Sequence, residues 1–202
     1  MKHSTIIPPN KLLGALLIGG KSTRMGAPKT LLCRGQETIG THLANLMVNT
    51  LNEPPVFLGQ GPMAPPWDSH PQLADQAGMN GPMGGFVTLQ MLFPNQWVLV
   101  LAVDLYFFEQ EALLWLISHW EKKSHLAIWP KFESRSFGEP LAAIYSPTAI
   151  THLVSAGFAG ERAIHRALPE SFRYQPTIPK YLEHQFQNVN RPEDLPYSMR
   201  GL

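Results

Sequence analysis

The sequence predicts an α/β protein with a mostly parallel sheet, because short apolar runs alternate along it with longer amphipathic segments. Residues 97–103 (WVLVLAV) have the length and content of a buried strand and stop at Asp104. Residues 12–18 are a second apolar run, ending at two adjacent glycines. Ile39–Leu51 instead repeats its large apolar residues at helical spacing. The run 12–18, the glycine loop and this helix together predict a β-loop-α unit.

The remaining elements continue the alternation. Val56–Leu58 predicts a strand, and a helix is expected from near Pro82, which suits a first helical turn, to Leu92. The later predicted elements are a helix over residues 109–121, strands over 126–129 and 141–145, and helices over 147–154 and 162–168. We therefore expect parallel strands joined by helices.

Length and composition favour one globular domain. The 202 residues, 44% of them hydrophobic and 15% charged, are enough for one sizeable core, so we expect a single domain over 1–202, with 1–11 as a flexible extension. The formal net charge is +1 and no basic block is present, so neither nucleic-acid nor membrane-surface binding is expected. No segment has the roughly 20 uncharged apolar residues of a membrane span.

The beginning of the chain has the outline of a signal peptide, with Lys2 before the apolar residues 12–20. Residues 8–11 (PPNK) interrupt this pattern, and no A-x-A cleavage site follows, so we expect a cytoplasmic protein. The single cysteine, Cys33, cannot form an internal disulfide and has no partner at zinc-ligand spacing. We expect Cys33 to be a small core residue rather than a nucleophile.

The loop within residues 16–32 (LLIGGKSTRMGAPKTLL) combines glycines, hydroxyls and cations. Its glycines are Gly19, Gly20 and Gly26, its hydroxyls Ser22 and Thr23, and its cations Lys21, Arg24 and Lys29. Glycines allow a ligand to approach main-chain N–H groups, and the cations favour phosphates. The alternative is a tight turn with a solvated basic rim. The loop is not a Walker motif, because no glycine precedes Lys29.

Five segments resemble, in order, the motifs of the small nucleotidyltransferases that include molybdenum cofactor guanylyltransferase. The family strings are L-x-G-G-x-S-x-R-M-G-x-x-K, an acidic residue before G-P-L-G-G, C-D-x-P-F, P-L-x-A-L-Y and N-x-N-x-P-E-D-L. The matching segments are 17–29, LADQAGMNGPMGGF (73–86), LAVDLYFF (101–108), PLAAIY (140–145) and NVNRPEDL (188–195). Together they extend over almost the whole chain.

The resemblance implies a doubly wound, Rossmann-like fold of the nucleotide-diphospho-sugar-transferase type. It also implies transfer of GMP from GTP to the terminal phosphate of molybdopterin or its molybdenum form, with release of pyrophosphate. A phosphate nucleophile needs no strong base, so catalysis would rest on alignment and on neutralising phosphate charge. The expected partners are these two substrates, with transient contacts to other molybdenum cofactor proteins.

The resemblance also assigns residues. Catalysis is expected from Arg24, Lys29 and Asp104, with Asp104 as the ligand of Mg²⁺, which usually takes only one or two protein carboxylates. Nucleotide contacts are expected from Leu17, Ile18, Gly19, Gly20, Lys29, Asp75, Gly81 and Asp104, and acceptor contacts from Asn188 and Asn190. Plainer roles stay open: a helix cap for Asp104, a loop bond toward Ala77 for Asp75, and a turn before Pro192 for the asparagines.

Three departures from the family pattern leave alternatives open. Pro28 replaces the usual Asp before Lys29, and a Pro-Lys pair is familiar in the related molybdopterin cytidylyltransferases. Tyr106 replaces the Pro expected after Asp104, and the family's Asn after the second strand has no clear match near residues 58–60. The alternatives are a nucleotidyltransferase that uses CTP or another acceptor, and a nucleotide- or cofactor-binding protein without turnover.

Overall fold

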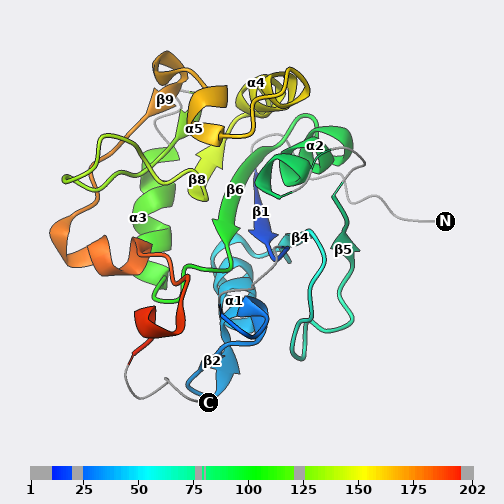
Figure 1. The fold of residues 1–202 in the computed structure, drawn as a ribbon, viewed down its shortest axis with the longest axis vertical. Coiled ribbons are helices and arrows are strands. Elements are labelled where there is room, and N and C mark those ends of the chain that lie inside the picture. The colour runs from blue at the N-terminus through cyan, green and yellow to red at the C-terminus, as the bar shows by residue number, and fades with distance from the viewer. Residues whose placement is uncertain (1–10, 20–24, 76–78, 80, 121–125, 197–202) are drawn as a thin grey trace.

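The computed structural model describes residues 11–19, 25–75, 79, 81–120 and 126–196. Residues 1–10 of the expected flexible extension lie outside these ranges, while Lys11 donates to Glu53 Oε1 at 2.6 Å. The centre is a seven-stranded sheet in the order β5-β4-β1-β6-β8-β7-β9 (Figure 1). The strands are β1 Leu12–Leu17, β4 Val56–Leu58, β5 Gln72–Leu73, β6 Trp97–Ala102, β7 Ala127–Ile128, β8 Ala142–Tyr145 and β9 Arg173–Tyr174.

The sheet is mostly parallel, as the alternation of elements predicts. Strands β5, β4, β1 and β6 run parallel, with Leu16 opposite both Phe57 and Leu101. Only β8 reverses direction among these strands, pairing antiparallel with β6 and β7, and β7 is parallel to β9. The reversal puts the start of β8 beside the end of β6.

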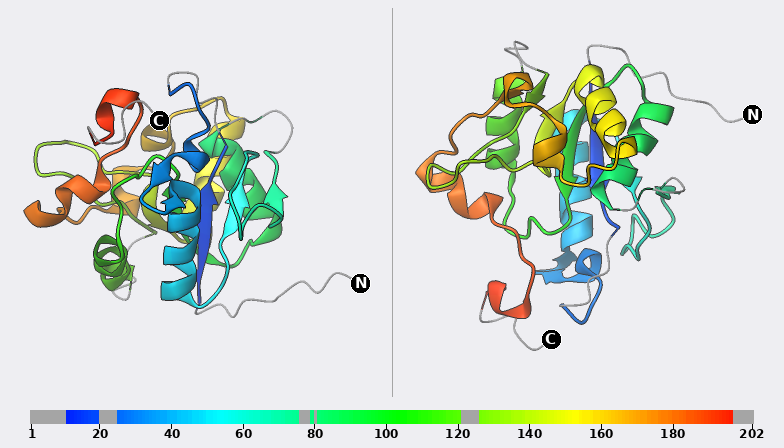
Figure 2. Two further views of the ribbon diagram at one scale, coloured as in Figure 1. Left: turned by 90° about the horizontal axis from the view of Figure 1, so that it is seen from below. Right: turned by 45° about the horizontal axis from the view of Figure 1, so that its top comes forward.

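Helices cover both faces of the sheet, which confirms the doubly wound arrangement (Figures 1 and 2). They are α1 Ile39–Leu51, α2 Pro82–Leu92, α3 Gln110–Trp120, α4 Pro147–Phe158 and α5 Ile164–Ala167. Successive strand residues point to opposite faces. Leu16 packs with α1 and α3 in one apolar cluster, and Leu17 packs with α2, α4 and α5 in the other. Within the described ranges, no helix combines the length and apolarity needed to cross a membrane.

Two helices differ from their predicted limits by more than one residue. Helix α4 extends to Phe158, beyond the predicted end at 154, and its Gly157 lies close against Met79 and Met83. A Cβ at Gly157 would come 2.9 Å from Met83 Cε, so a larger residue there would have to displace the flexible end of that side chain. Helix α5 occupies only Ile164–Ala167 of the predicted 162–168.

Short elements that the sequence does not predict lie outside the sheet. A 3₁₀ turn, η1 (Lys29–Leu31), leads into a hairpin of β2 (Cys33–Arg34) and β3 (Glu37–Thr38). The prediction that Cys33 belongs to the core is wrong, because this hairpin exposes it. Near the C-terminus lie η2 Glu170–Phe172, η3 Lys180–Phe186 and η4 Pro192–Asp194. Phe186 of η3 is fully buried against Trp115 of α3, which anchors this last segment.

Candidate active site

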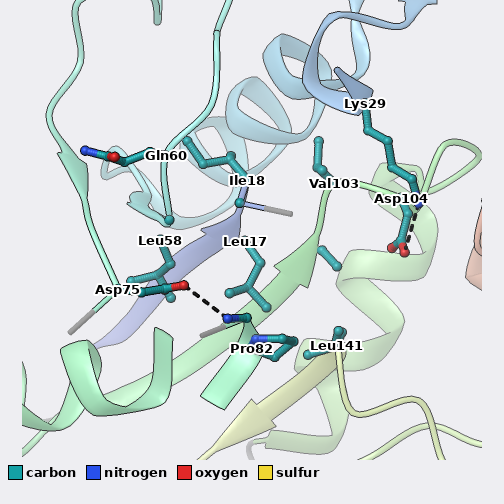
Figure 3. Close-up of a pocket in the computed structure, with 14 residues that line it drawn as sticks. Leu17, Ile18, Lys29, Leu58, Gln60, Asp75, Pro82, Val103, Asp104 and Leu141 are labelled. Atoms are coloured by element: carbon teal, nitrogen blue, oxygen red, sulfur yellow. Dashed lines mark hydrogen bonds and ion pairs between the residues drawn. The ribbon is translucent and has the colours of Figure 1, made fainter. Parts of the chain in front are cut away.

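A pocket of about 780 Å³ opens where β1, β4 and β6 reach their carboxyl ends (Figure 3). This is the edge at which α/β sheets bind ligands. The pocket is lined by Leu17, Ile18, Gly19, Lys29, Leu58, Gly59, Gln60, Asp75, Gly81, Pro82, Ala102, Val103, Asp104 and Leu141. All the described residues expected to contact nucleotide therefore line this one pocket. Gly20 and Arg24, which were also expected here, lie outside the described residues.

Main-chain bonds join the ends of the strands at the pocket. Ile18 N donates to Leu58 O at 3.0 Å, and Val103 N donates to Leu17 O at 3.1 Å. Gly59 has a φ of +87°, and a Cβ there would lie 2.7 Å from Gly19 Cα. The glycines at 19 and 59 therefore let the chain segments leaving β1 and β4 touch, which leaves backbone rather than side chains at this part of the pocket.

Asp75 holds the beginning of α2 at one side of the pocket. Its Oδ2 accepts from Gly81 N at 3.1 Å, immediately before Pro82 starts the helix. A Cβ at Gly84 would lie 2.8 Å from Asp75 Cγ, so the carboxyl group rests directly on the first helical turn. The helix dipole favours a carboxylate at this end. The alternative bond toward Ala77 involves a residue outside the described ranges.

Lys29 and Asp104 face each other on the side opposite Asp75 (Figure 3). Lys29 Nζ lies 3.6 Å from Asp104 Oδ2, and it donates to Asn190 Oδ1 at 2.8 Å. The side chains of Lys29 and Asp104 are only 16% and 22% exposed. Lys29 comes from η1, and Asp104 follows the end of β6. An anion entering this side of the pocket would meet a partly buried ammonium group.

Burial dominates the electrostatics of Asp104. It raises the pKa of this carboxyl group above the ordinary value of 3.8, and the neighbouring Lys29 ammonium group counteracts part of that rise. Asp104 Oδ1 is buried and has no hydrogen-bond partner among the described residues. One oxygen thus interacts with Lys29 while the other keeps its coordinating capacity. Hard divalent cations such as Mg²⁺ bind oxygen ligands of this kind.

No group of three or more His, Cys, Asp and Glu side chains in the described ranges could hold a metal ion. This does not conflict with the expected Mg²⁺ site. Magnesium keeps several of its waters and is usually held by one or two carboxylates together with substrate phosphates. The Asp104 carboxylate therefore fits such an ion by its chemistry.

The motif at 188–195 reaches the same side of the pocket. Val189 N donates to Asp104 O at 2.8 Å, which places Asn190 beside Lys29. Asp194 Oδ2 accepts from the main-chain N of Asn190 at 2.8 Å, and it also accepts from Arg191 N. These bonds lower the pKa of Asp194 and cap the short η4 turn. Both asparagines are exposed, and Asn190 is the one whose side chain accepts from Lys29.

Sequence reasoning missed several residues of this pocket. Gln60 lies two residues after the end of β4 and lines the pocket, near the place where the family's asparagine was not found. Pro82, Val103 and Leu141 also line it. Their positions next to the motif residues were the only available signal, because apolar and main-chain contacts have no distinctive sequence pattern.

The chain is similar to curated relatives named for molybdenum cofactor synthesis. It is 30% identical over 199 residues to a probable molybdenum cofactor guanylyltransferase of Rhodopirellula baltica, covering 93% of this chain and 91% of the relative. It is 28% identical to a molybdenum cofactor biosynthesis bifunctional protein of Synechocystis, covering 91% of this chain and 52% of the relative. The chain therefore spans about half the length of that bifunctional relative.

Solved structures share the fold. Molybdopterin-guanine dinucleotide biosynthesis protein A from Archaeoglobus fulgidus superposes with a TM-score of 0.70 at 22% identity, covering 94% of this chain and 97% of the other. 4-Diphosphocytidyl-2C-methyl-D-erythritol synthase superposes with a TM-score of 0.58 at 13% identity, covering 91% and 95%. These neighbours confirm the predicted nucleotide-diphospho-sugar-transferase-like fold.

The sequence also matches a known domain family along most of its length. The match covers residues 14–174, from β1 to β9, and includes four of the five motifs on which the resemblance rests. The resemblance found in the sequence is thereby confirmed. The chain belongs to the family of MobA-like NTP transferase domains.

Proposed function

We propose that this protein transfers GMP from GTP to the terminal phosphate of molybdopterin or its molybdenum form, with pyrophosphate as the second product. The observation that carries the proposal is the pairing of Lys29 with Asp104 across one pocket from Asp75. The names of the curated relatives support guanine as the base. We also propose that residues 1–202 act as one nucleotidyltransferase domain.

In the proposed reaction, an oxygen of the acceptor phosphate attacks the α-phosphorus of GTP in line. One P–O bond forms, and the bond from the α-phosphorus to the bridging oxygen breaks, so pyrophosphate leaves with the bonding electron pair. The acceptor oxygen is already anionic and needs no base. Lys29 would neutralise charge on the phosphates, and Arg24 would add a second cation from the same loop.

Members of this family generally use a divalent metal ion. We propose Mg²⁺, held by Asp104, because Oδ1 of this carboxylate is buried and unpartnered among the described residues. Bound there, the ion would neutralise phosphate charge and help to orient the α-phosphate. Lys29 would keep the second carboxylate oxygen in place.

The base would bind at the other side of the pocket. The proposed contacts are the main chain of Leu17, Ile18, Gly19 and Gly20, together with Asp75 and Gly81 at the beginning of α2. Gln60 offers an amide with both a donor and an acceptor, and we propose that it takes the place of the family's asparagine. We assign Asn190 and Asn188 to the acceptor, since their motif lies beside Lys29 and Asp104.

A second candidate is transfer of CMP from CTP, or use of another phosphorylated acceptor. It is favoured by Pro28, which directly precedes η1 and Lys29 and takes the place of the family's usual Asp. A protein that binds nucleotide without turnover is the third candidate, motivated by Tyr106 in place of Pro. All three candidates share the pocket and differ in which nucleotide, if any, releases pyrophosphate there.

The test is pyrophosphate release from GTP, CTP and ATP in parallel, with Mg²⁺ and molybdopterin. We expect release from GTP that disappears in Asp104→Ala and persists in the control Glu53→Ala, whose carboxylate pairs with Lys11 outside the pocket lining. Preferential release from CTP would favour the second candidate. Nucleotide binding without release from any of the three would support the third candidate and contradict the proposal.

A further inference from the structure

Lys29 and Asp104 both stand on short, irregular segments. Lys29 begins a 3₁₀ turn of three residues, and Asp104 lies just past the last residue of β6. Lys29 Nζ lies 3.6 Å from Asp104 Oδ2, so the two side chains form an ion pair. Their relative position also depends on contacts between the segments that follow them. These are the β2–β3 hairpin, residues 33–38, and the loop of residues 104–109.

Arg34 of the hairpin binds this loop at two points. Its Nε donates to Tyr106 O at 3.0 Å, and its Nη2 donates to the Glu109 carboxylate. The Arg34 side chain is only 22% exposed. A guanidinium group is planar and presents its donors in a fixed fork, so two bonds to one loop define that loop's orientation. Arg34 is not among the residues that line the pocket.

Tyr106 forms a further bond between the loop and the hairpin. Its hydroxyl donates to Cys33 O at 2.9 Å, and its side chain is buried. Tyr106 is the second residue of a turn closed by the bond from Phe108 N to Leu105 O at 3.1 Å. Proline is favoured at that turn position, and proline is the residue that the family motif has there. In this chain, a hydroxyl group ties the turn to the hairpin instead.

Helix α1 also contacts both the hairpin and the loop, through His42. His42 Nε2 lies 2.9 Å from Phe108 O, and His42 Nδ1 lies 3.0 Å from Glu37 Oε1 and 3.1 Å from Arg34 Nη1. His42 is buried, and Glu109 Oε2 lies 3.6 Å from its Nε2. The hairpin, the loop and α1 thus form one connected polar network, which we call the hairpin network: Arg34, Glu37, His42, Tyr106 and Glu109.

We propose that Arg34 is a positioning residue for the transfer reaction, holding the Asp104 loop against the segment that carries Lys29. This inference rests on the proposed function for its effect on rate. Arg34 acts through the geometry of Lys29 and Asp104 and touches no substrate. Loss of Arg34 should therefore lower kcat much more than it changes KM for GTP, because the proposed contacts to the base lie on the far side of the pocket.

The size of the effect is limited by other contacts of the loop. Val189 N donates to Asp104 O at 2.8 Å, and Gln185 Oε1 accepts from Glu109 N at 3.1 Å. The C-terminal segment thus also holds the loop. Since a displacement of about 1 Å at a reacting group costs up to roughly 100-fold in rate, we expect Arg34→Gln to lower kcat by about 10- to 100-fold.

The kinetic experiment compares Arg34→Gln with Arg166→Gln, a matched control. Arg166 forms a two-point ion pair with Glu161 at 2.8 and 2.9 Å and is exposed on α5. We expect Arg166→Gln to leave kcat unchanged, and Arg34→Gln to leave KM for GTP within about twofold. In a Lys29→Ala background, Arg34→Gln should add less than about twofold, because its target is already missing. A full loss in both backgrounds, or an unchanged kcat, would overturn the proposal.

A second measurement keeps the inference separate from the proposed function. Amide hydrogen exchange of Leu105, Phe108 and Glu109 is followed in the substrate-free protein, in Arg34→Gln, Tyr106→Phe and Arg166→Gln. Faster exchange in the first two variants than in the control supports the proposal, whichever nucleotide is the donor. Equal exchange in all three overturns it. A native protein that releases no pyrophosphate contradicts the proposed function. In that case the exchange rates alone test whether Arg34 holds the Asp104 loop in place.

Discussion

The Lys29 ammonium group lies 3.6 Å from the Asp104 carboxylate, although the two residues come from different loops. Asn190, near the end of the chain, accepts from the same ammonium group at 2.8 Å. The cation therefore sits between the carboxylate that fits a metal ion and a motif proposed for the acceptor. Changes at any of the three residues should affect the proposed phosphate chemistry in distinguishable ways.

Replacing Lys29 should mainly slow turnover. We expect Lys29→Ala to lower kcat/KM for GTP-dependent pyrophosphate release by about 100- to 1,000-fold, because it removes a cation from the site where negative charge develops. Lys11→Ala is the control, since Lys11 forms a surface ion pair with Glu53. An unaltered kcat/KM in Lys29→Ala would refute the proposed role.

We expect the Asp104 carboxylate to lower the free energy of unfolding, although the proposed reaction requires it. Burial raises its pKa, so the fold disfavours the charged carboxylate, whereas an asparagine carries no charge. With a chelator present at pH 7, we expect Asp104→Asn to have a free energy of unfolding about 1 kcal/mol higher than the native protein. The same variant should lose metal-dependent turnover.

The pH dependence follows from the sign of this shift. The folded state binds the Asp104 proton more tightly than the unfolded state, so its contribution is fully present below pH 3.8 and is lost as pH rises through the raised pKa. The difference between the native protein and Asp104→Asn should therefore shrink on acidification. Urea unfolding at several pH values measures it, and a less stable variant at pH 7 would contradict the prediction.

Gly84 should be required for the position of the Asp75 carboxyl group. A Cβ there would meet Met79 O at 2.6 Å and Asp75 Cγ at 2.8 Å, so Gly84→Ala must move either backbone or the carboxyl group. We expect a loss of about 1–3 kcal/mol in stability and a higher KM for GTP. Gly85→Ala is the matched comparison for stability, since its nearest atom is the flexible end of Leu17 at 3.0 Å. Equal unfolding free energies for the two variants would argue against this packing.

Asn190 should affect the acceptor more than the nucleotide. We expect Asn190→Ala to raise KM for molybdopterin about 10-fold, because it removes a hydrogen bond to a charged group beside the proposed acceptor phosphate. KM for GTP should change little. Gln187→Ala, at an exposed position of the same segment, is the control. A rise in KM for GTP alone would assign this asparagine to the nucleotide instead.

The main strands and helices could be predicted because burial produces a periodic pattern. Strands β1, β4 and β6 and helices α1 and α2 lie where the apolar runs and helical spacing place them, to within a residue. The hairpin of residues 33–38 was missed, and Cys33 was misplaced with it. Strands of two residues are too short for any periodicity, so nothing local indicates them.

The direction of β8 also could not be predicted from the sequence pattern. Its apolar run, residues 142–145, is the same whether the strand pairs parallel or antiparallel, because both orientations bury both faces. The reversal brings Leu141 to the pocket by way of the bond from Ala102 N to Leu141 O at 2.9 Å.

The sequence by itself determined the family and the side chains available for phosphate chemistry. It also determined the order along the chain of the glycine and acidic motifs that follow the strands. Only the tertiary structure decided which of them meet. Lys29 contacts Asp104 and Asn190, and Arg34 reaches Tyr106, through bonds between segments far apart in the chain. Such bonds depend on how the loops pack in space, and the sequence around each bonded residue has no local pattern that predicts them.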